Sequence, residues 1–142
     1  MSTINPSLHF AMNLTRLQAV LSRKFNRLSI HGISLNDFIV LHLLAQATEE
    51  KLRRIDLAEK MGVTASGITR LLLPLEKIGL VSRHASERDA RVSYTVLTAT
   101  GRRLYADAKE TANAVAKELI PVEKVKSKHL TELFTQLGVT TL

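Results

Sequence analysis

The chain has 142 residues, 45% of them hydrophobic and 23% charged, which suits one compact domain or two very small ones that share a core. The absence of cysteine excludes thiol redox sensing and cysteine-ligated zinc. Aromatic residues make up only 4% of the chain, which argues against a stacking platform for single-stranded nucleic acid. Neither a signal peptide nor an apolar stretch long enough to span a bilayer is visible, so we expect a cytoplasmic protein with no membrane partner.

The net charge of +7 is concentrated in the middle of the sequence. Eleven basic and five acidic side chains lie between residues 51 and 103, and the remainder of the chain is nearly neutral. A nearly neutral protein with one strongly basic segment is expected to meet a polyanion there. On charge alone, a basic surface that is merely solvated is the alternative.

The first third of the sequence predicts two helices. Pro6 suits a first helical turn, and apolar residues then recur at helical spacing over about residues 7 to 29. Ser34 followed by Asp37 resembles a capping box, with Asp in place of Glu or Gln. A second helix is expected to follow it, with an apolar face that includes His42.

The middle of the sequence predicts a helix-turn-helix. A short strand is expected at 52–53 and a short helix at 55–61, where Gly62 supplies the left-handed residue that ends the helix. Thr64 is a good N-cap for the next helix, whose apolar face ends near Gly79. Pro74 lies inside that helix, so we expect a kink or a local distortion there.

The apolar period then changes from 3.6 to about 2, which predicts a two-stranded hairpin. Its strands are expected at 80–84 and 92–97, joined by the polar turn 85–90. Such a hairpin is marginal alone and must pack on the preceding helices. Thr98 or Thr100 is expected to cap a long helix that Pro121 interrupts, and a last helix follows.

This order, helix-turn-helix and then basic hairpin, is typical of a winged helix, a mainly α fold with a small β-hairpin wing. The major groove of duplex DNA accepts an α-helix whose first turns reach base edges. The first turns of the second helix of the motif carry hydroxyls and an arginine suited to that task, namely Thr64, Ser66, Thr69 and Arg70. Arg88 and Arg91 at the hairpin tip are expected to reach the minor groove, and Arg53 and Arg54 to contact backbone phosphates.

Several runs of residues resemble the MarR (multiple antibiotic resistance regulator) family. Leu57-Ala58-Glu59 through Gly62 and Gly79-Leu80-Val81 resemble its helix-turn-helix. The stretch Asp89-Ala90-Arg91, a strand, and then Leu97-Thr98-Ala99-Thr100-Gly101 matches its wing pattern more specifically. The sequence departs from the family at Leu73 and Pro74, where polar residues are usual, and at Arg53, where a Ser or Thr cap is usual.

The resemblance implies a homodimer in which each subunit presents one winged helix to half of a palindromic operator. Residues 1–33 and 99–142 would form a helical dimerisation region, and 34–98 the DNA-binding domain. A chain this short cannot bury the apolar faces of three long helices by itself. This also favours a large interface between two subunits related by a two-fold axis. The resemblance further implies that Asp89 orients Arg91, and that the protein is a repressor which a small, often aromatic or anionic, effector releases from DNA.

His9, Asn13 and Arg16 form a polar row beside the apolar stripe of the first helix. They are candidates, together with His42, for one wall of an effector pocket, since the family places such a pocket near the dimer junction. A solvated face for the row, and a hydrogen-bonded core position for His42, are the alternatives. The five histidines show no i, i+4 pairing, so we expect no metal and no cofactor.

Two other classes of function compete with a DNA-binding regulator. A winged helix used only as a protein-interaction module would show apolar anchors on the second helix and the wing, and Leu73 is the one residue that favours it. An enzyme is not expected, because the sequence has no Ser-His-Asp set at a motif, no Gly-rich phosphate loop and no carboxylate cluster.

Overall fold

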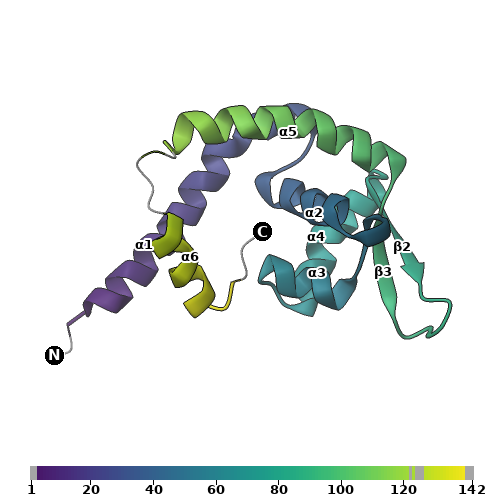
Figure 1. The fold of residues 1–142 in the computed structure, drawn as a ribbon, viewed down its shortest axis with the longest axis horizontal. Coiled ribbons are helices and arrows are strands. Elements are labelled where there is room, and N and C mark those ends of the chain that lie inside the picture. Colours follow the sequence, from purple (N-terminus) through teal and green to yellow (C-terminus); the bar gives the residue numbers. More distant parts are fainter. Residues whose placement is uncertain (1–2, 122, 124–126, 140–142) are drawn as a thin grey trace.

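A computed structural model describes residues 3–121, 123 and 127–139. Figure 1 shows helices at both ends of the chain and a small sheet beside the central helices. The elements in chain order are α1 (Pro6–Lys24), the 3₁₀ helix η1 (Phe25–His31), α2 (Leu35–Gln46), the 3₁₀ turn η2 (Thr48–Glu50), β1 (Lys51–Arg53), α3 (Arg54–Met61), α4 (Ala65–Lys77), β2 (Val81–Ala85), β3 (Ser93–Leu97), α5 (Ala99–Leu119) and α6 (Ser127–Gln136).

The N-terminal helix begins as predicted and ends earlier. Asn5 caps it by accepting a hydrogen bond from the Leu8 N–H (2.8 Å), and Pro6 occupies its first position. The predicted single helix over 7–29 is wrong in its last turns, because the chain continues from Phe25 as the 3₁₀ helix η1. Phe25 and Leu28 are both buried, and three residues per turn place them on one face. The change of helix type therefore turns both side chains into the core.

The capping box at the start of α2 is confirmed. The Asp37 N–H donates to the Ser34 Oγ (3.2 Å), and the Ser34 N–H donates to the Asp37 Oδ2 (2.9 Å). Asp therefore replaces the usual Glu without loss of either bond. Val40, Leu41 and Leu44 of α2 are buried, so this helix runs through the centre of the core.

The sheet has three strands in place of the predicted two-stranded hairpin. Its order is β1-β3-β2 with both pairs antiparallel, and Leu52 pairs with Thr95 while Val81 pairs with Leu97. The short strand predicted at 52–53 is thus the third strand, which pairs with the otherwise free edge of β3. This pairing supplies the support that a lone hairpin lacks. The predicted fold, mainly helical with a β-hairpin wing, is otherwise confirmed.

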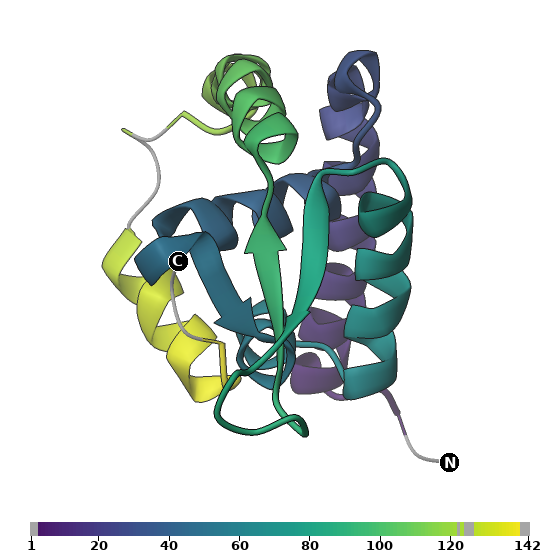
Figure 2. The same ribbon diagram turned by 90° about the vertical axis from the view of Figure 1, so that its right-hand side faces the viewer.

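A single core joins the central helices, the sheet and α5. Its most deeply buried members are aliphatic and come from segments far apart in the sequence; they include Leu28, Leu41, Leu44, Leu57, Ile68, Leu72, Ala108 and Val115. In Figure 2, α5 lies above α2 and the sheet, and the sheet leads down to the β2–β3 loop. The core therefore fixes the position of this loop, which we call the wing, relative to α4.

Thr98 caps α5 and also joins it to the end of α4. Its Oγ1 accepts a hydrogen bond from the Gly101 N–H (3.0 Å) and lies 2.7 Å from the Gly79 carbonyl oxygen, to which it donates. Farther along α5, Thr111 contacts His31 (2.8 Å), and Glu118 forms an ion pair with Arg27 (2.8 Å). One helix thus connects the sheet to the N-terminal segment.

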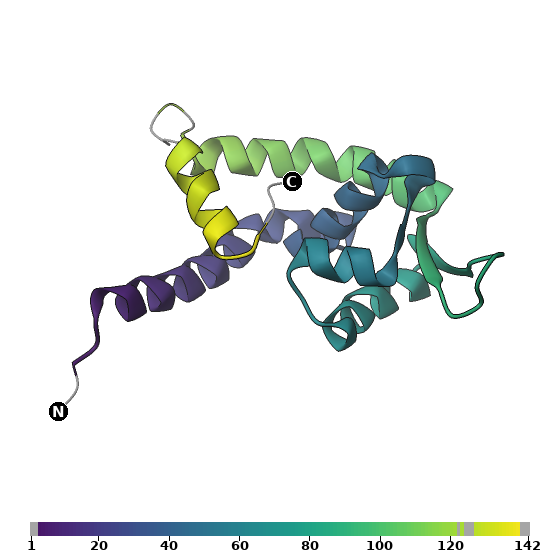
Figure 3. The same cartoon turned by 60° about the horizontal axis from the view of Figure 1, so that its bottom comes forward.

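Both terminal helices extend away from the winged helix, as Figures 1 and 3 show for α1 and α6. None of the α1 residues is buried. Large apolar side chains of these two helices and of the residues beside them are exposed, namely Ile4, Leu8, Phe10, Met12, Leu17, Val20, Leu130, Phe134, Leu137 and Val139.

Within the described ranges, no single helix is long and apolar enough to cross a membrane. One pair of segments, Pro6–His31 and Leu35–Gln46, reaches the required length and hydropathy together, across a bend of 70°. The second segment carries the buried Val40, Leu41 and Leu44, which already pack in the core described above.

Candidate nucleic-acid interface

Hydroxyl side chains surround the N-terminus of α4. Thr64 caps the helix, since its Oγ1 accepts a hydrogen bond from the Gly67 N–H (3.1 Å), and Ser66 Oγ lies 3.2 Å from the same oxygen. Thr64 and Ser66 are both exposed. A helix N-terminus offers unpaired backbone N–H groups and the positive end of the helix dipole. The first turn of α4 is therefore arranged to receive an anion such as a phosphate.

Arg53 and Arg54 are both engaged in bonds within the protein. Arg53 Nε donates to Asp56 Oδ2 (2.9 Å), and the Arg53 side chain provides no cap, as its identity led us to expect. Arg54 is only 15% exposed; its Nη1 donates to Glu76 Oε1 (3.1 Å) and its Nη2 to Thr69 Oγ1 (3.3 Å). Arg54 thus holds α3 against α4, and a phosphate contact by its guanidinium remains a prediction.

The exposed face of α4 carries Ser66, Arg70, Leu73 and Lys77, which recur at i+4, i+7 and i+11. Arg70 and Lys77 form no hydrogen bond or ion pair with the described residues. Pro74 does not break the helix, since α4 is continuous from Ala65 to Lys77, and the expected kink or local distortion stays a prediction. Pro74 lies in the last turn, so only the bond to the Arg70 carbonyl is lost before the helix ends.

The wing is organised by one carboxylate. Asp89 Oδ1 accepts from the Arg91 backbone N–H (3.0 Å) and from its Nε (3.1 Å), and Oδ2 accepts from Arg91 Nη2 (3.3 Å). The side-chain bonds first, and the backbone bond second, lower the pKa of the Asp89 carboxyl below its ordinary value. The predicted orientation of Arg91 by Asp89 is therefore present in the geometry, and the Arg91 side chain is still 91% exposed.

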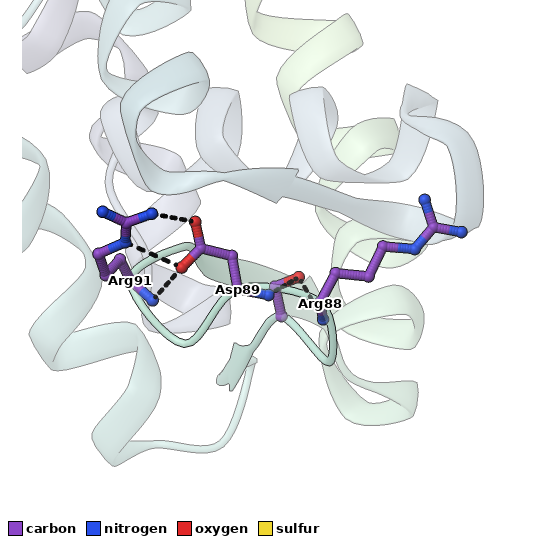
Figure 4. A network of polar contacts seen from close by, with 4 residues as sticks. Arg88, Asp89 and Arg91 are labelled. Carbon is purple, nitrogen blue, oxygen red and sulfur yellow. Dashed lines mark hydrogen bonds and ion pairs between the residues drawn. The ribbon is translucent and has the colours of Figure 1, made fainter.

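Arg88 lies on the other side of the same loop. Figure 4 shows Arg91 folded against Asp89, whereas the Arg88 side chain extends in the opposite direction. Ser86 Oγ accepts from the Arg88 and Asp89 backbone N–H groups (3.2 and 3.4 Å), which tightens the turn between them. In the portion of the chain that the structure describes, the Arg88 guanidinium has no partner. The wing therefore presents one oriented and one free guanidinium to solvent.

The wing and the first turn of α4 lie toward the same end of the molecule, the lower end in Figure 2. Together they place Arg70, Arg88 and Arg91 on a surface with small hydroxyl side chains. Guanidinium groups form bidentate hydrogen bonds with phosphates and with the edge of guanine. The arrangement fits a helix in a major groove with a cationic loop beside it.

Comparison with known proteins agrees with this geometry. A sequence profile described as "MarR family" matches residues 33–93. The HTH-type transcriptional repressor Rv2887 of Mycobacterium tuberculosis is 31% identical over 127 residues, which cover 88% of this chain and 90% of that protein. The regulator YdgJ of Bacillus subtilis is 30% identical over 99 residues, 70% of this chain and 59% of that protein. The chain belongs to the MarR family. It is thus related to DNA-binding transcriptional regulators.

Solved structures of MarR family proteins share the fold. BldR of Sulfolobus solfataricus has a TM-score of 0.76 at 25% identity and covers 96% of this chain and 97% of its own. Sco3205 of Streptomyces coelicolor, solved in complex with DNA, has a TM-score of 0.76 at 18% identity, with 96% and 87% covered. NadR, solved with 4-hydroxyphenylacetate, has a TM-score of 0.71 at 26% identity, with 97% and 98% covered.

The candidate effector residues of this MarR family chain are not brought together within one subunit. His9, Asn13 and Arg16 are exposed on α1. His42 is partly buried on α2, where its Nδ1 lies 2.7 Å from the Tyr105 hydroxyl of α5. Their role in effector binding stays a prediction. Among the described residues, no group of three or more histidines and carboxylates could hold a metal ion.

Two polar features of the MarR fold were missed by sequence reasoning. Arg102 on α5 binds Glu50 in a fork, with Nε–Oε1 and Nε–Oε2 distances of 3.0 and 2.9 Å. Lys51 on β1 lies 5.1 Å from the ring centroid of Tyr94 on β3 and pairs with Glu49 (2.9 Å). Both depend on the β1–β3 pairing, and the only sequence signal for that pairing was the two-residue strand at 52–53.

Proposed function

We propose that this chain is a transcriptional repressor that binds an inverted-repeat operator as a homodimer in the cytoplasm. The observation that carries the proposal is the exposed surface formed by α4 and the wing. Its cations are Arg70 and Arg88, which have no partner among the described residues, and Arg91, which Asp89 orients. Thr64, Ser66 and Thr69 would contact the same duplex, and Arg53 and Arg54 the phosphates beside it once their internal bonds adjust.

The exposed apolar side chains of α1 and α6 support the dimer. Side chains that are about half exposed at ten positions near both termini would be costly in a free monomer, since each buried apolar side chain contributes about 1.5–3 kcal/mol. We propose that residues 1–33 and 99–142 form the two-fold interface and that 34–98 binds DNA. The two winged helices of such a dimer would reach half-sites about one helical turn apart, ~34–36 Å.

A small aromatic or anionic effector would release the operator under this proposal. NadR was solved with 4-hydroxyphenylacetate, which is both aromatic and anionic. His42, with His9, Asn13 and Arg16 from the same or the other subunit, would supply polar contacts for such a molecule. The phenol of Tyr105 stacks on Phe38 at a centroid distance of 5.4 Å and bonds His42, so ring contacts are available at this position.

Selection of bound genomic fragments, followed by fluorescence anisotropy on the selected duplex, tests the function. We expect an inverted repeat, a strong decrease of affinity with salt, and a preference of at least a thousandfold over random duplex. Arg91→Ala should weaken specific binding by roughly 1–3 kcal/mol. The control is Lys60→Ala, because Lys60 is an exposed cation on α3 that belongs neither to the proposed interface nor to the proposed operator contacts. Equal affinity for random and selected duplexes would overturn the proposal.

A further inference from the structure

The exposed face of α4 carries an apolar residue between its cations. Leu73 is 48% exposed, although it lies on the helix that the core otherwise buries through Ile68, Leu72 and Leu75. Arg70 and Lys77 stand at i−3 and i+4 from it, so all three side chains neighbour one another on the same face. If this face of the helix contacted only phosphates, the leucine side chain would make no favourable contact with the DNA.

Thr69 adds a second apolar group to this face. Its Oγ1 donates to the Ala65 carbonyl oxygen (3.0 Å) and accepts from Arg54 Nη2 (3.3 Å). The hydroxyl hydrogen is therefore committed to the helix, and the methyl group is the part of this exposed side chain that remains for an external partner. Thr69 and Leu73 are four residues apart, so the methyl and the leucine side chain adjoin. We call these two residues the apolar strip.

The charges around the apolar strip indicate what it contacts. From Ala65 to Leu75 the helix has no acidic residue, and Glu76 is bound to Arg54. Arg70 and Lys77 are free of partners within the described part of the chain. A polyanion that also presents small apolar groups is complementary to this face. In the major groove of DNA, the 5-methyl group of thymine is such a group, whereas the other base edges there are polar.

We infer that the apolar strip reads the 5-methyl group of a thymine in each operator half-site, next to the base or phosphate that Arg70 contacts. The inference rests on the proposed function, since it requires specific binding of a duplex. It assigns Leu73 a role in sequence discrimination, in place of the polar readout that hydroxyls and arginines alone would give. A protein partner on the same face is the competing occupant.

The test replaces each thymine of the selected operator, one symmetric pair at a time, with deoxyuridine, which removes only the methyl group. For the wild-type protein we expect one symmetric pair of thymines whose replacement weakens binding about tenfold. One lost methyl contact should weaken binding about threefold to fourfold in each half-site, and the effects of the two half-sites multiply. For Leu73→Ala and Leu73→Gln, binding to the unmodified operator should be weaker, and the same replacement should have little further effect. Loss of the replacement effect in the variants is the signature of a direct contact.

Two controls separate the possible failures. Ile78→Ala removes an apolar side chain that is 56% exposed at the C-terminal end of α4, outside the proposed two-fold interface, and it should keep the full replacement effect. Arg70→Ala should weaken binding and also keep that effect. If the wild type binds a selected operator but no thymine position is sensitive, or if sensitivity is unchanged in Leu73→Ala, the inference is overturned while the proposed function stands. If no duplex is bound specifically, both are overturned.

Discussion

Gly101→Ala should destabilise the protein, although alanine is the better helix former. Gly101 lies in the first turn of α5, and an added Cβ would be 2.1 Å from the Leu80 carbonyl oxygen and 2.9 Å from Leu97 Cδ1. An ordinary carbon–oxygen contact is about 3.3 Å, so roughly 1.2 Å of overlap must be relieved against backbone. Helix propensity alone would stabilise the variant by about 1 kcal/mol, so the sign of the effect tests the packing.

The size of the effect follows from what must move. Overpacking of a tight site costs about 1–3 kcal/mol. Moving α5 away from Leu80 also weakens the hydrogen bonds that Thr98 makes to the Gly79 and Leu80 carbonyls (2.7 and 3.0 Å), and a lost hydrogen bond costs about 1 kcal/mol more. We therefore expect a decrease of about 2–4 kcal/mol in the free energy of unfolding.

Urea unfolding followed by far-ultraviolet circular dichroism measures this decrease. Wild type and variant are compared at one protein concentration, because the stability of the proposed dimer would depend on it. Thr100→Ala is the control: it changes an exposed residue of the same helical turn and should stay within about 0.5 kcal/mol of wild type. A Gly101→Ala protein as stable as wild type, or more stable, would refute the close approach of α5 to the end of α4.

Three further changes test other contacts. Thr95→Val should raise the free energy of unfolding by about 1 kcal/mol, measured by urea unfolding, because the buried Thr95 hydroxyl has no hydrogen-bond partner among the described residues. A loss of stability would contradict this. Arg54→Ala should lower stability by about 1–3 kcal/mol through the uncompensated Glu76, and Arg54→Leu with Glu76→Leu should recover part of it. The pKa of Glu50 is lowered by its hydrogen bonds to Arg102, so the stability it contributes is present above the ordinary Glu pKa and is lost as the pH falls through the folded value. The difference between wild type and Glu50→Gln at pH 7 should thus become smaller as the pH falls below the ordinary Glu pKa, and a difference that does not shrink would contradict the assignment.

Local signals in the sequence predicted most of the elements, because caps and glycines act within one helical turn. Ser34 with Asp37, Thr64, and Gly62 with its φ of +69° all occupy the predicted positions. Thr98 was one of two candidates for the cap of α5, and the structure selects it because its hydroxyl also reaches the Gly79 carbonyl. That choice depends on a contact 19 residues away, which no local pattern contains.

The errors arose where long-range contacts decide the structure. The apolar stripe continues through Phe25 and Leu28, so periodicity alone could not show that the chain tightens into η1 to bury them. Strand β1 has three residues, too few for an alternating pattern, and its pairing with β3 joins segments about 40 residues apart. The site follows the same rule. Its exposed arginines were predictable from the motif, whereas the burial of Arg54 between Thr69 and Glu76 required the packing of α3 on α4.

The continuity of α5 has a mechanical consequence. Its 21 residues form a rod about 31 Å long, attached to the sheet at one end through Thr98. It is attached to the N-terminal segment near its middle through Thr111 and near its other end through Glu118. Rotation of such a rod by about 6° about one end displaces the other by about 3.3 Å, nearly the rise of one base pair. A small reorientation of the terminal helices would thereby move the sheet end of α5, and the wing beyond it, by a distance close to one base-pair step.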